Sequence, residues 1–483
     1  MARPAPSRVI APASPNATVR LYRQGLGDCL LVTLDDGSGS PFRIMIDCGI
    51  YQTASNAKAK IRAVVEDIIE ASGGFVDLLV ASHEHWDHIS GFNQAHDLFA
   101  KPSEGRIPGK LAVGKVWLGW TEDPNDPDAR KLEAEKALAL RGVTAALALA
   151  EARSATALAK GLGSILDFFG ANRTTRDALE FVRGLAPETP RYCRPSDPPS
   201  SIAPGFRIFA LGPPLDPKAI HQLISETEVY HLGPPSFESE AFVGVVETQL
   251  AGRGLEHDPG QPFDVSQRLG MDFEQAPAAP SDAPTDAERF FWERYWGPAA
   301  DDPLTDQDWR RIDSDWLGSA ADLALKLDNA TNNTSLVLAV EFIASGKVLL
   351  FAADAQVGSW MTWPGLEWTL PDGEVVRGAD LLRRTGFYKV GHHGSHNATL
   401  KAKGLETMAS PDLIAAIPVD EALAKKVGWG RMPLPGLMSA LAEHTKGRVV
   451  RTDQDFVGIG NEAVAFEAAL VRTELFYEFR INP

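Results

Sequence analysis

Three histidines and an aspartate stand within six consecutive positions, and their types and spacing are those of a metal site. They are His83, His85, Asp87 and His88, in the pattern His-x-His-x-Asp-His. Alternate residues of an extended segment face the same way, so His83 and His85 can point at one ion while Asp87 and His88, past the turn, reach a second. Imidazole and carboxylate ligands suit zinc, and also manganese or iron. A solvated polar loop is the alternative, but four ligand-type side chains at this spacing favour metal.

The elements around this cluster must hold it in place. Residues 76–80 are an apolar run that predicts a buried strand, so the cluster should lie on the loop at its end. Apolar residues at helical spacing predict a helix over 57–70 that leads back to this strand. Asp28 and Asp47 stand beside glycines at the ends of predicted strands. Turn formation explains these two carboxylates as well as a role in the site does.

Two more groups of ligand type follow in the second half of the chain. Strands are predicted over 334–340, 347–351 and 386–390. The second leads into Asp354, for which a helix cap is the alternative, and the third leads into His392 and His393. Adjacent residues of an extended chain face opposite sides. One histidine of the pair is therefore expected to bind the ion that Asp87 and His88 reach, and the other to act as an acid or to contact substrate.

These motifs, in this order, resemble the metallo-β-lactamase superfamily of two-metal hydrolases. Within it they are similar to the hydrolase domain of bacterial DNA-uptake channel (competence) proteins and to bacterial phosphorylcholine esterases. The similarity covers about 18–120, 205–230 and 330–460. The motifs that carry it are Gly25-x-Gly27-Asp28, Asp47-Cys48-Gly49, the cluster His83 to His88, Asn332-Asn333-x-Ser335, Asp354 and His392-His393-Gly394-Ser395.

The resemblance implies an α/β fold, the αβ/βα four-layer sandwich, with the metal site at one edge of two facing sheets. It assigns His83 and His85 to a first ion and Asp87, His88 and His393 to a second, with Asp354 bridging both. Asp28 and Asp47 would not bind the ions themselves but would orient the residues that do. Many relatives add a histidine to the first ion, and no motif marks one here. Water takes that place, or one of the other histidines does: His96, His221, His231 or His257.

The activity that the resemblance implies is hydrolysis of a phosphodiester by a metal-bound hydroxide, with two divalent ions, expected to be zinc. Asp87 would orient the hydroxide, and His392 would assist the leaving group. One alternative is the same site acting on a lactone, an amide or a thioester. Another is a metal-stabilised binding or regulatory module without catalysis.

Composition limits the partners and the compartment. A net charge of −17 over 483 residues argues against a broad surface for duplex nucleic acid, but it is compatible with a small or nucleotide-type anionic substrate. The three cysteines have no CxxC spacing, the N-terminal segment lacks a signal peptide's apolar stretch, and no apolar run is long enough to span a membrane. These features predict a cytoplasmic protein.

The predicted organisation is a disordered arm over 1–17 and one hydrolase domain over 18–483. Two insertions interrupt that domain. The first, at about 121–200, is predicted to be helical because it is rich in Ala, Leu, Glu and Lys. The second, at about 232–330, combines a low-complexity loop with an aromatic and helical segment. Either insertion could engage a protein partner.

Overall fold

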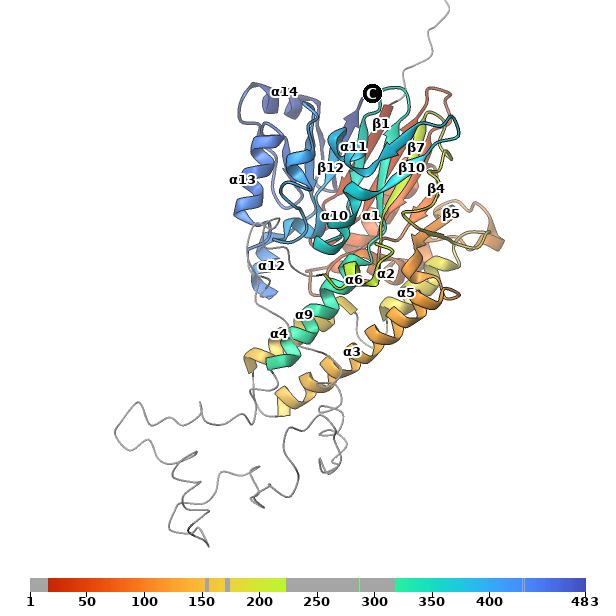
Figure 1. The fold of residues 1–483 in the computed structure, drawn as a ribbon. Coiled ribbons are helices and arrows are strands. Elements are labelled where there is room, and N and C mark those ends of the chain that lie inside the picture. Colours follow the sequence, from red (N-terminus) through yellow and green to blue (C-terminus); the bar gives the residue numbers. More distant parts are fainter. Residues whose placement is uncertain are drawn as a thin grey trace, which may run out of the picture. The chain divides into compact units, whose positions relative to one another are not determined.

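The computed structural model describes residues 16–152, 156–169, 174–222, 286, 318–427, 429 and 431–483. Contacts divide the chain into two compact units, and the first holds 1–134, 164–234 and 326–483. The second holds 135–163 and 235–325, most of which lies outside the described residues. The cluster His83 to His88, the aspartates Asp28, Asp47 and Asp354, and the pair His392-His393 all belong to the first unit, which is a mixed α/β structure (Figure 1).

The first unit contains an eight-stranded sheet in the order β15-β16-β1-β2-β3-β4-β5-β6. Strands β1 to β3 are antiparallel neighbours, and β3 to β6 run parallel. Asp35 accepts a hydrogen bond from the backbone of Gly37 at 2.8 Å in the β2–β3 connection. The strands are β1 Asn16–Tyr22, β2 Leu30–Asp35, β3 Phe42–Ile46, β4 Phe75–Val80, β5 Ala112–Gly119, β6 Arg191–Cys193, β15 Val471–Arg472 and β16 Phe476–Ile481.

A six-stranded sheet in the order β14-β13-β12-β9-β8-β7 forms the other half of the unit. Its strands β9, β12, β13 and β14 are parallel, so their carboxyl ends meet at one edge. Asp354 follows β9 and the pair His392-His393 follows β12, as the sequence predicted. The strands are β7 Phe206–Gly212, β8 Val337–Phe342, β9 Val348–Phe351, β12 Thr385–Lys389, β13 Ile414–Ile417 and β14 Val449–Arg451.

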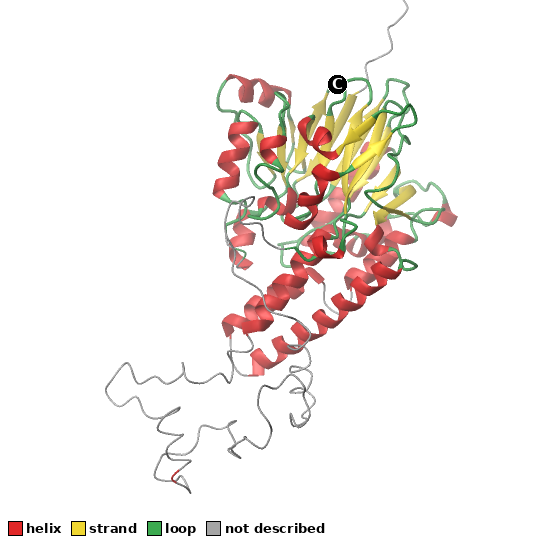
Figure 2. Cartoon of the chain, viewed as in Figure 1, coloured by secondary structure: helices red, strands yellow, loops and turns green. Residues whose placement is uncertain are grey.

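Two apolar cores hold these layers together. One joins the facing sides of the sheets, with Val32 and Leu78 from the first sheet and Leu338 and Phe387 from the second, all 1% exposed or less. The other lies between the first sheet and helices α1, α2 and α5. Each fully buried apolar side chain of this size stabilises the fold by about 1.5–3 kcal/mol. Figure 2 shows the sheets with helices against their outer faces, which is the layout of an α/β sandwich.

The helices agree with the sequence in most places. The expected helix over 57–70 is α1, and Asp216 caps α6 by accepting from the backbone of Lys218. The helical segment predicted within the insertion at about 232–330 falls largely outside the described residues, whose helix there is α9. The helices are α1 Ala57–Ser72, α2 Trp86–Gln94, α3 Pro127–Ala152, α4 Thr156–Leu166, α5 Thr174–Arg183, α6 Pro217–Ile220, α9 Gly318–Asn333, α10 Val357–Thr362, α11 Gly378–Arg383, α12 Glu421–Val427, α13 Pro435–His444 and α14 Asn461–Ala469.

The two predicted insertions are described unequally. Helices α3, α4 and α5 occupy most of the segment at 121–200 for which helix was predicted. Residues 1–15, the low-complexity loop and the aromatic segment near 290–296 lie outside the described residues, so the predictions for them stay predictions. Among the described residues, no helix combines the length and the apolar character needed to cross a membrane.

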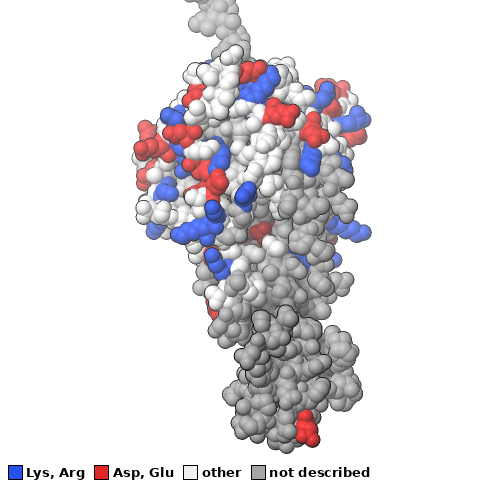
Figure 3. All heavy atoms as spheres, turned by 90° about the vertical axis from the view of Figure 1, so that its left-hand side faces the viewer, with Lys and Arg blue, Asp and Glu red and all other residues white. Residues whose placement is uncertain are grey.

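The charge on one face of the protein is mixed. Figure 3 shows Lys and Arg interspersed with Asp and Glu among the described residues of that face. Two ion pairs beside the second sheet also join opposite charges. Lys446 pairs with Glu462 at 2.8 Å, and Arg451 pairs with Glu421 at 2.6 Å. On this face, therefore, the net negative charge of the chain is not gathered into a single acidic patch.

Candidate metal centre

The His83–His88 cluster spans the end of a strand and the start of a helix. His83 and His85 lie on the loop after β4, and His85 is the residue at which α2 is capped. Asp87 and His88 lie in the first turn of α2, rather than on a loop as predicted. All four side chains are buried, with 1% exposure or less. A carboxylate in the first turn of a helix is favoured by the helix dipole.

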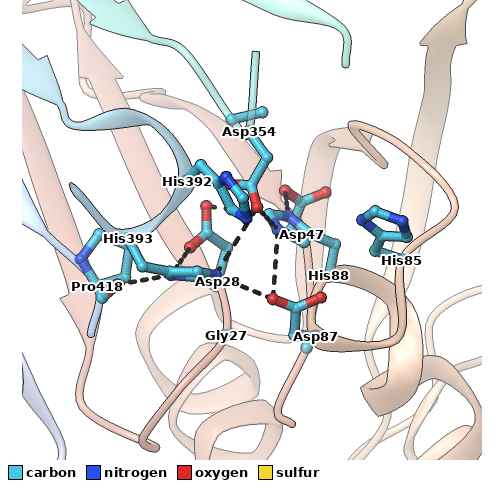
Figure 4. A network of polar contacts seen from close by, with 12 residues as sticks. Gly27, Asp28, Asp47, His85, Asp87, His88, Asp354, His392, His393 and Pro418 are labelled. Atoms are coloured by element: carbon cyan, nitrogen blue, oxygen red, sulfur yellow. Dashed lines mark hydrogen bonds and ion pairs between the residues drawn. The ribbon is translucent and has the colours of Figure 1, made fainter. Parts of the chain in front are cut away.

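Asp28, His88, Asp354 and His393 bring four ligand atoms within 4.8 Å of one another (Figure 4). His88 Nε2 lies 3.1 Å from Asp354 Oδ2. His393 Nε2 lies 3.7 Å from the same oxygen. Each of the four residues is at most 1% exposed. Two imidazoles and two carboxylates at these separations could hold a metal ion.

Asp87 adjoins this group. Its Oδ2 lies 2.9 Å from His393 Nε2 and 3.8 Å from His88 Nε2. Its Oδ1 is buried and has no hydrogen-bond partner. The sequence made Asp87 a ligand and Asp28 a supporting residue. The structure places both beside the two histidines, with one oxygen of Asp28 inside the group of four.

The backbone holds these residues at close range. Asp28 N donates to Asp87 O at 2.9 Å, Gly49 N donates to Asp28 O at 2.8 Å, and Cys48 N donates to His88 O at 2.7 Å. A Cβ at position 49 would lie 1.8 Å from Asp87 O. Only glycine fits such an approach, which explains why glycine follows Asp47-Cys48 in this motif.

Asp47 fixes the orientation of His88. It accepts from Ser82 N and Ser82 Oγ, both at 2.7 Å, and His88 Nδ1 lies 2.8 Å from its Oδ2. With Nδ1 engaged, His88 presents Nε2 to Asp354 (Figure 4). A carboxylate behind a histidine in this way fixes its tautomer and its ring orientation. The contact between Asp47 and His88 is the one that the predicted supporting role of Asp47 needs.

No sequence motif marks Lys389, which lies inside β12 and is 1% exposed. Its Nζ forms an ion pair with Asp28 and donates to Ala353 O at 2.8 Å. Asp354 Oδ1 lies 3.5 Å from the same Nζ. A lysine in a strand carries no motif, so only the fold reveals that it faces the carboxylates.

His83 and His85 lie beside the group of four, not within it. His83 Nε2 is 3.1 Å from His85 Nδ1, and His83 Nδ1 is 3.3 Å from Ser335 Oγ. Ser335 Oγ also accepts from Asp354 N at 3.2 Å, so this serine links the loop of His83 to that of Asp354. The ring of His85 packs against Phe168 and Phe169, with centroids 5.2 Å and 5.0 Å away.

His392 and His393 have different partners, but for another reason than predicted. Both residues have positive φ, 41° and 52°, so the argument from an extended chain is wrong. The left-handed turn directs His393 to Asp87, and its Nδ1 lies 2.7 Å from Pro418 O. His392 Nδ1 lies 3.0 Å from Gln356 Nε2. Of the pair, His393 belongs to the group of four.

Burial and charge set the protonation of the histidines. Burial lowers the pKa of His85 to about 3 and that of His392 to about 4, so both rings are neutral at pH 7. Burial also acts to lower the pKa of His88, but Asp354 and Asp28 outweigh it and raise that pKa well above its usual value. Burial acts to raise the pKa of Asp354, but His88 and His393 lower it well below its usual range.

The residues fit a divalent cation. Buried polar atoms without a hydrogen-bond partner include Asp28 Oδ1, Asp87 Oδ1, His85 Nε2 and His88 Nε2. Buried polar atoms normally have partners, so several orphans at one place indicate a missing ligand. All four are carboxylate oxygens or imidazole nitrogens, the kinds of atom that bind zinc.

The other histidines considered for the first ion contribute little. His96 and His221 are both exposed. His231 and His257 lie outside the described residues.

Comparison with known proteins returned no family. No protein-family model matches the chain, and no curated protein matches it. The argument about function therefore rests on the site.

Proposed function

We propose that the protein is a hydrolase of the metallo-β-lactamase superfamily that uses two divalent metal ions, expected to be zinc, to cleave a phosphodiester. The observation that carries this proposal is the buried group of Asp28, His88, Asp354 and His393. Its members come from both sheets and meet at one edge of the sandwich. The phosphodiester rests on the resemblance of the motifs, because a fold does not determine a substrate.

The ligand atoms can be divided between two ions. His88, His393 and Asp87 would hold the second ion, and His83 with His85 would hold the first. The carboxylate of Asp354 lies 3.1 Å from His88 Nε2, and its backbone N donates to Ser335 Oγ, which lies 3.3 Å from His83 Nδ1. Asp354 therefore lies between the two sets of ligands and would be the bridge. Two divalent ions at such a site lower the pKa of water and stabilise negative charge on the substrate and leaving oxygens.

Asp87 is placed to orient the attacking water. One of its oxygens contacts His393, and the other is buried without a partner, so it can accept a hydrogen bond. Its pKa is lowered: burial acts to raise it, but His88 and His393 outweigh burial. Asp87 is therefore ionised at neutral pH and acts as an acceptor.

His392 is placed to donate a hydrogen bond to the substrate. Asn397 Nδ2 donates to Gln356 Oε1 at 2.8 Å, which leaves the Gln356 amide nitrogen to donate to His392 Nδ1 at 3.0 Å. A neutral imidazole that accepts at Nδ1 carries its proton on Nε2. Because its pKa is about 4, this ring acts as a neutral donor toward a developing oxyanion, and not as an imidazolium.

Aromatic side chains close one side of the site. Phe168 contacts His85 and stacks on Trp429, with ring centroids 4.5 Å apart. Tyr51 contacts both of these aromatic rings, at 5.6 Å and 4.8 Å. Such a wall excludes water beside the first ion, which strengthens electrostatic interactions within the site.

The proposal is tested with metal-replete protein and a panel of chromogenic substrates. We expect turnover of a nitrophenyl phosphodiester, loss of turnover on chelation, and recovery with zinc or manganese. If a lactone, an amide or a thioester is hydrolysed in preference, the proposed hydrolytic site is supported and the proposed phosphodiester substrate is wrong. Two bound ions without turnover of any substrate would favour a binding module, and absence of bound metal would refute the proposal.

A further inference from the structure

A buried carboxylate that no motif marks lies next to His85. Asp328, on α9, is 8% exposed, and its Oδ1 is 3.8 Å from His85 Nε2. Neither atom has a hydrogen-bond partner. His85 is itself only 1% exposed. Two buried polar atoms thus lie close to each other but beyond hydrogen-bonding distance, and no described residue forms a hydrogen bond with either of them.

Asp328 is held in this orientation by its own helix. Asn332 Nδ2 donates to Asp328 Oδ2 at 3.2 Å, which leaves Oδ1 directed at the imidazole. The same end of α9 is anchored near the site by two other residues. Asn333 Oδ1 accepts from Gln356 N at 3.1 Å, and Asn397 Nδ2 donates to Asn329 at 3.1 Å. The position of Asp328 therefore follows from a network that includes the loops after β9 and β12.

The separation fits two ligands of one ion better than a direct contact. Zinc binds nitrogen and oxygen at about 2.0–2.2 Å, so two ligand atoms in tetrahedral geometry lie roughly 3.4 Å apart. The observed 3.8 Å is close to that value and too long for a hydrogen bond. Two histidines and one carboxylate are, moreover, a common set of protein ligands at catalytic zinc sites.

The placement of buried cations points the same way. Among the described residues, no lysine or arginine pairs with Asp328, whereas Lys389 pairs with Asp28. A buried carboxylate without a cation beside it is costly, and a divalent ion would supply the missing positive charge.

We propose that Asp328 is a ligand of the first ion, together with His83 and His85, at the place where the resemblance leads one to expect a histidine. This inference rests on the proposed two-metal centre. It assigns a role to α9, which lies far in sequence from the His-x-His-x-Asp-His motif, and it completes a three-residue protein ligand set beside the shared Asp354.

The first test compares metal binding by wild-type protein and Asp328→Asn, which keeps the shape of the side chain. Asp167→Asn is the matched control, because Asp167 is a half-buried carboxylate near the site whose partner is Tyr51. With zinc and a chromogenic chelator, we expect wild type and control to hold two ions. In Asp328→Asn one ion should bind at least about tenfold more weakly. Two ions held with wild-type affinity would overturn the assignment.

The second test asks whether the side chain at position 328 touches the metal. Asp328→Cys and Asp167→Cys are loaded with cobalt(II), for which thiolate is a strong ligand. A thiolate-to-cobalt charge-transfer band in the near ultraviolet is expected for the first variant alone. A folded Asp328→Cys variant that binds cobalt without this band would contradict the proposal. Wild type that binds no metal would instead refute the two-metal function itself.

Discussion

His393 Nε2 lies 2.9 Å from Asp87 Oδ2, although 306 residues separate the two in sequence. This contact joins the loop after β12 to the first turn of α2, and hence one sheet to the other. It also separates the histidine pair, because His392 contacts Gln356 and Ser395 instead. The two histidines should accordingly respond differently to replacement.

His393→Ala should lower metal content and turnover together, because it removes a member of the group of four. His392→Ala should keep both ions and lose turnover by about 10²–10³, the effect of removing one preorganised hydrogen-bond donor. Elemental analysis beside kcat for both variants distinguishes the roles. Exchanged outcomes would mean that His392 is the ligand, and full activity in both would remove the pair from the site.

Asp354→Ala should reduce metal occupancy at both sites, since its carboxylate lies 3.1 Å from His88 Nε2 and is the proposed bridge. His396→Ala serves as the control, because His396 is exposed and lies beyond the turn that holds the histidine pair. Metal content of the two purified variants, compared with wild type, is the measurement. Equal loss in both variants would contradict the bridging role.

Uptake of zinc by metal-free protein should release protons. Burial acts to lower the pKa of His88 and of His393, but Asp354 outweighs it for both rings and, with neighbouring carboxylates, raises each pKa above its usual value. Both rings therefore hold their protons to a higher pH than a free imidazole does, and a bound ion must displace those protons. Binding should release protons, and apparent affinity should rise with pH.

An indicator dye in weakly buffered solution measures this release during a zinc titration. His88→Ala is the matched variant, and it should release fewer protons. Zinc binding that is independent of pH between mildly acidic and neutral conditions would show that these rings are neutral before the metal arrives.

Gly49→Ala should destabilise the fold and the site together. The added Cβ would lie 1.8 Å from Asp87 O, so the backbone that carries Asp28 or Asp87 must move. Overpacking of this kind costs about 1–3 kcal/mol, and more where backbone is displaced. Urea denaturation with a parallel metal assay is the measurement.

Gly436→Ala is the opposite case. Position 436 lies in α13, and a Cβ there would have no neighbour within 4 Å. Alanine in a helix is favoured over glycine, so stability should rise by up to about 1 kcal/mol with metal content unchanged. A similar loss of stability in both variants would mean that the close contact between position 49 and Asp87 O does not cause the loss.

The sequence was sufficient to locate site residues where side chains of ligand type follow a predicted strand. The cluster His83 to His88 after an apolar run, Asp354 after β9 and the histidine pair after β12 were all located by pattern. Apolar patterns located the strands at 76–80, 334–340, 347–351 and 386–390 and the helix at 57–70, because each of these elements buries a face against a core. Parallel strands then brought their carboxyl ends to one edge.

Residues outside these patterns could not be found in the same way. Asp328 lies on a helix and Lys389 within a strand, and neither is next to a glycine turn or another ligand. Their importance depends on which segments meet in space. The extended-chain argument for the histidine pair failed because both residues have a left-handed backbone, which their residue type does not indicate.

The last described strand also has a consequence for how the chain folds. β16 pairs with β1 along six residues, from Ala17 opposite Ile481 to Tyr22 opposite Phe476. The first sheet therefore acquires this partner for β1 only when segments from opposite ends of the described chain meet. Contacts between such distant segments slow folding, because the entropy of closing a long loop must be lost before the contact stabilises anything. If the pairing of β16 with β1 forms late, one edge of β1 stays unpaired during folding. In that state, chaperone binding and aggregation compete with completion of the sheet.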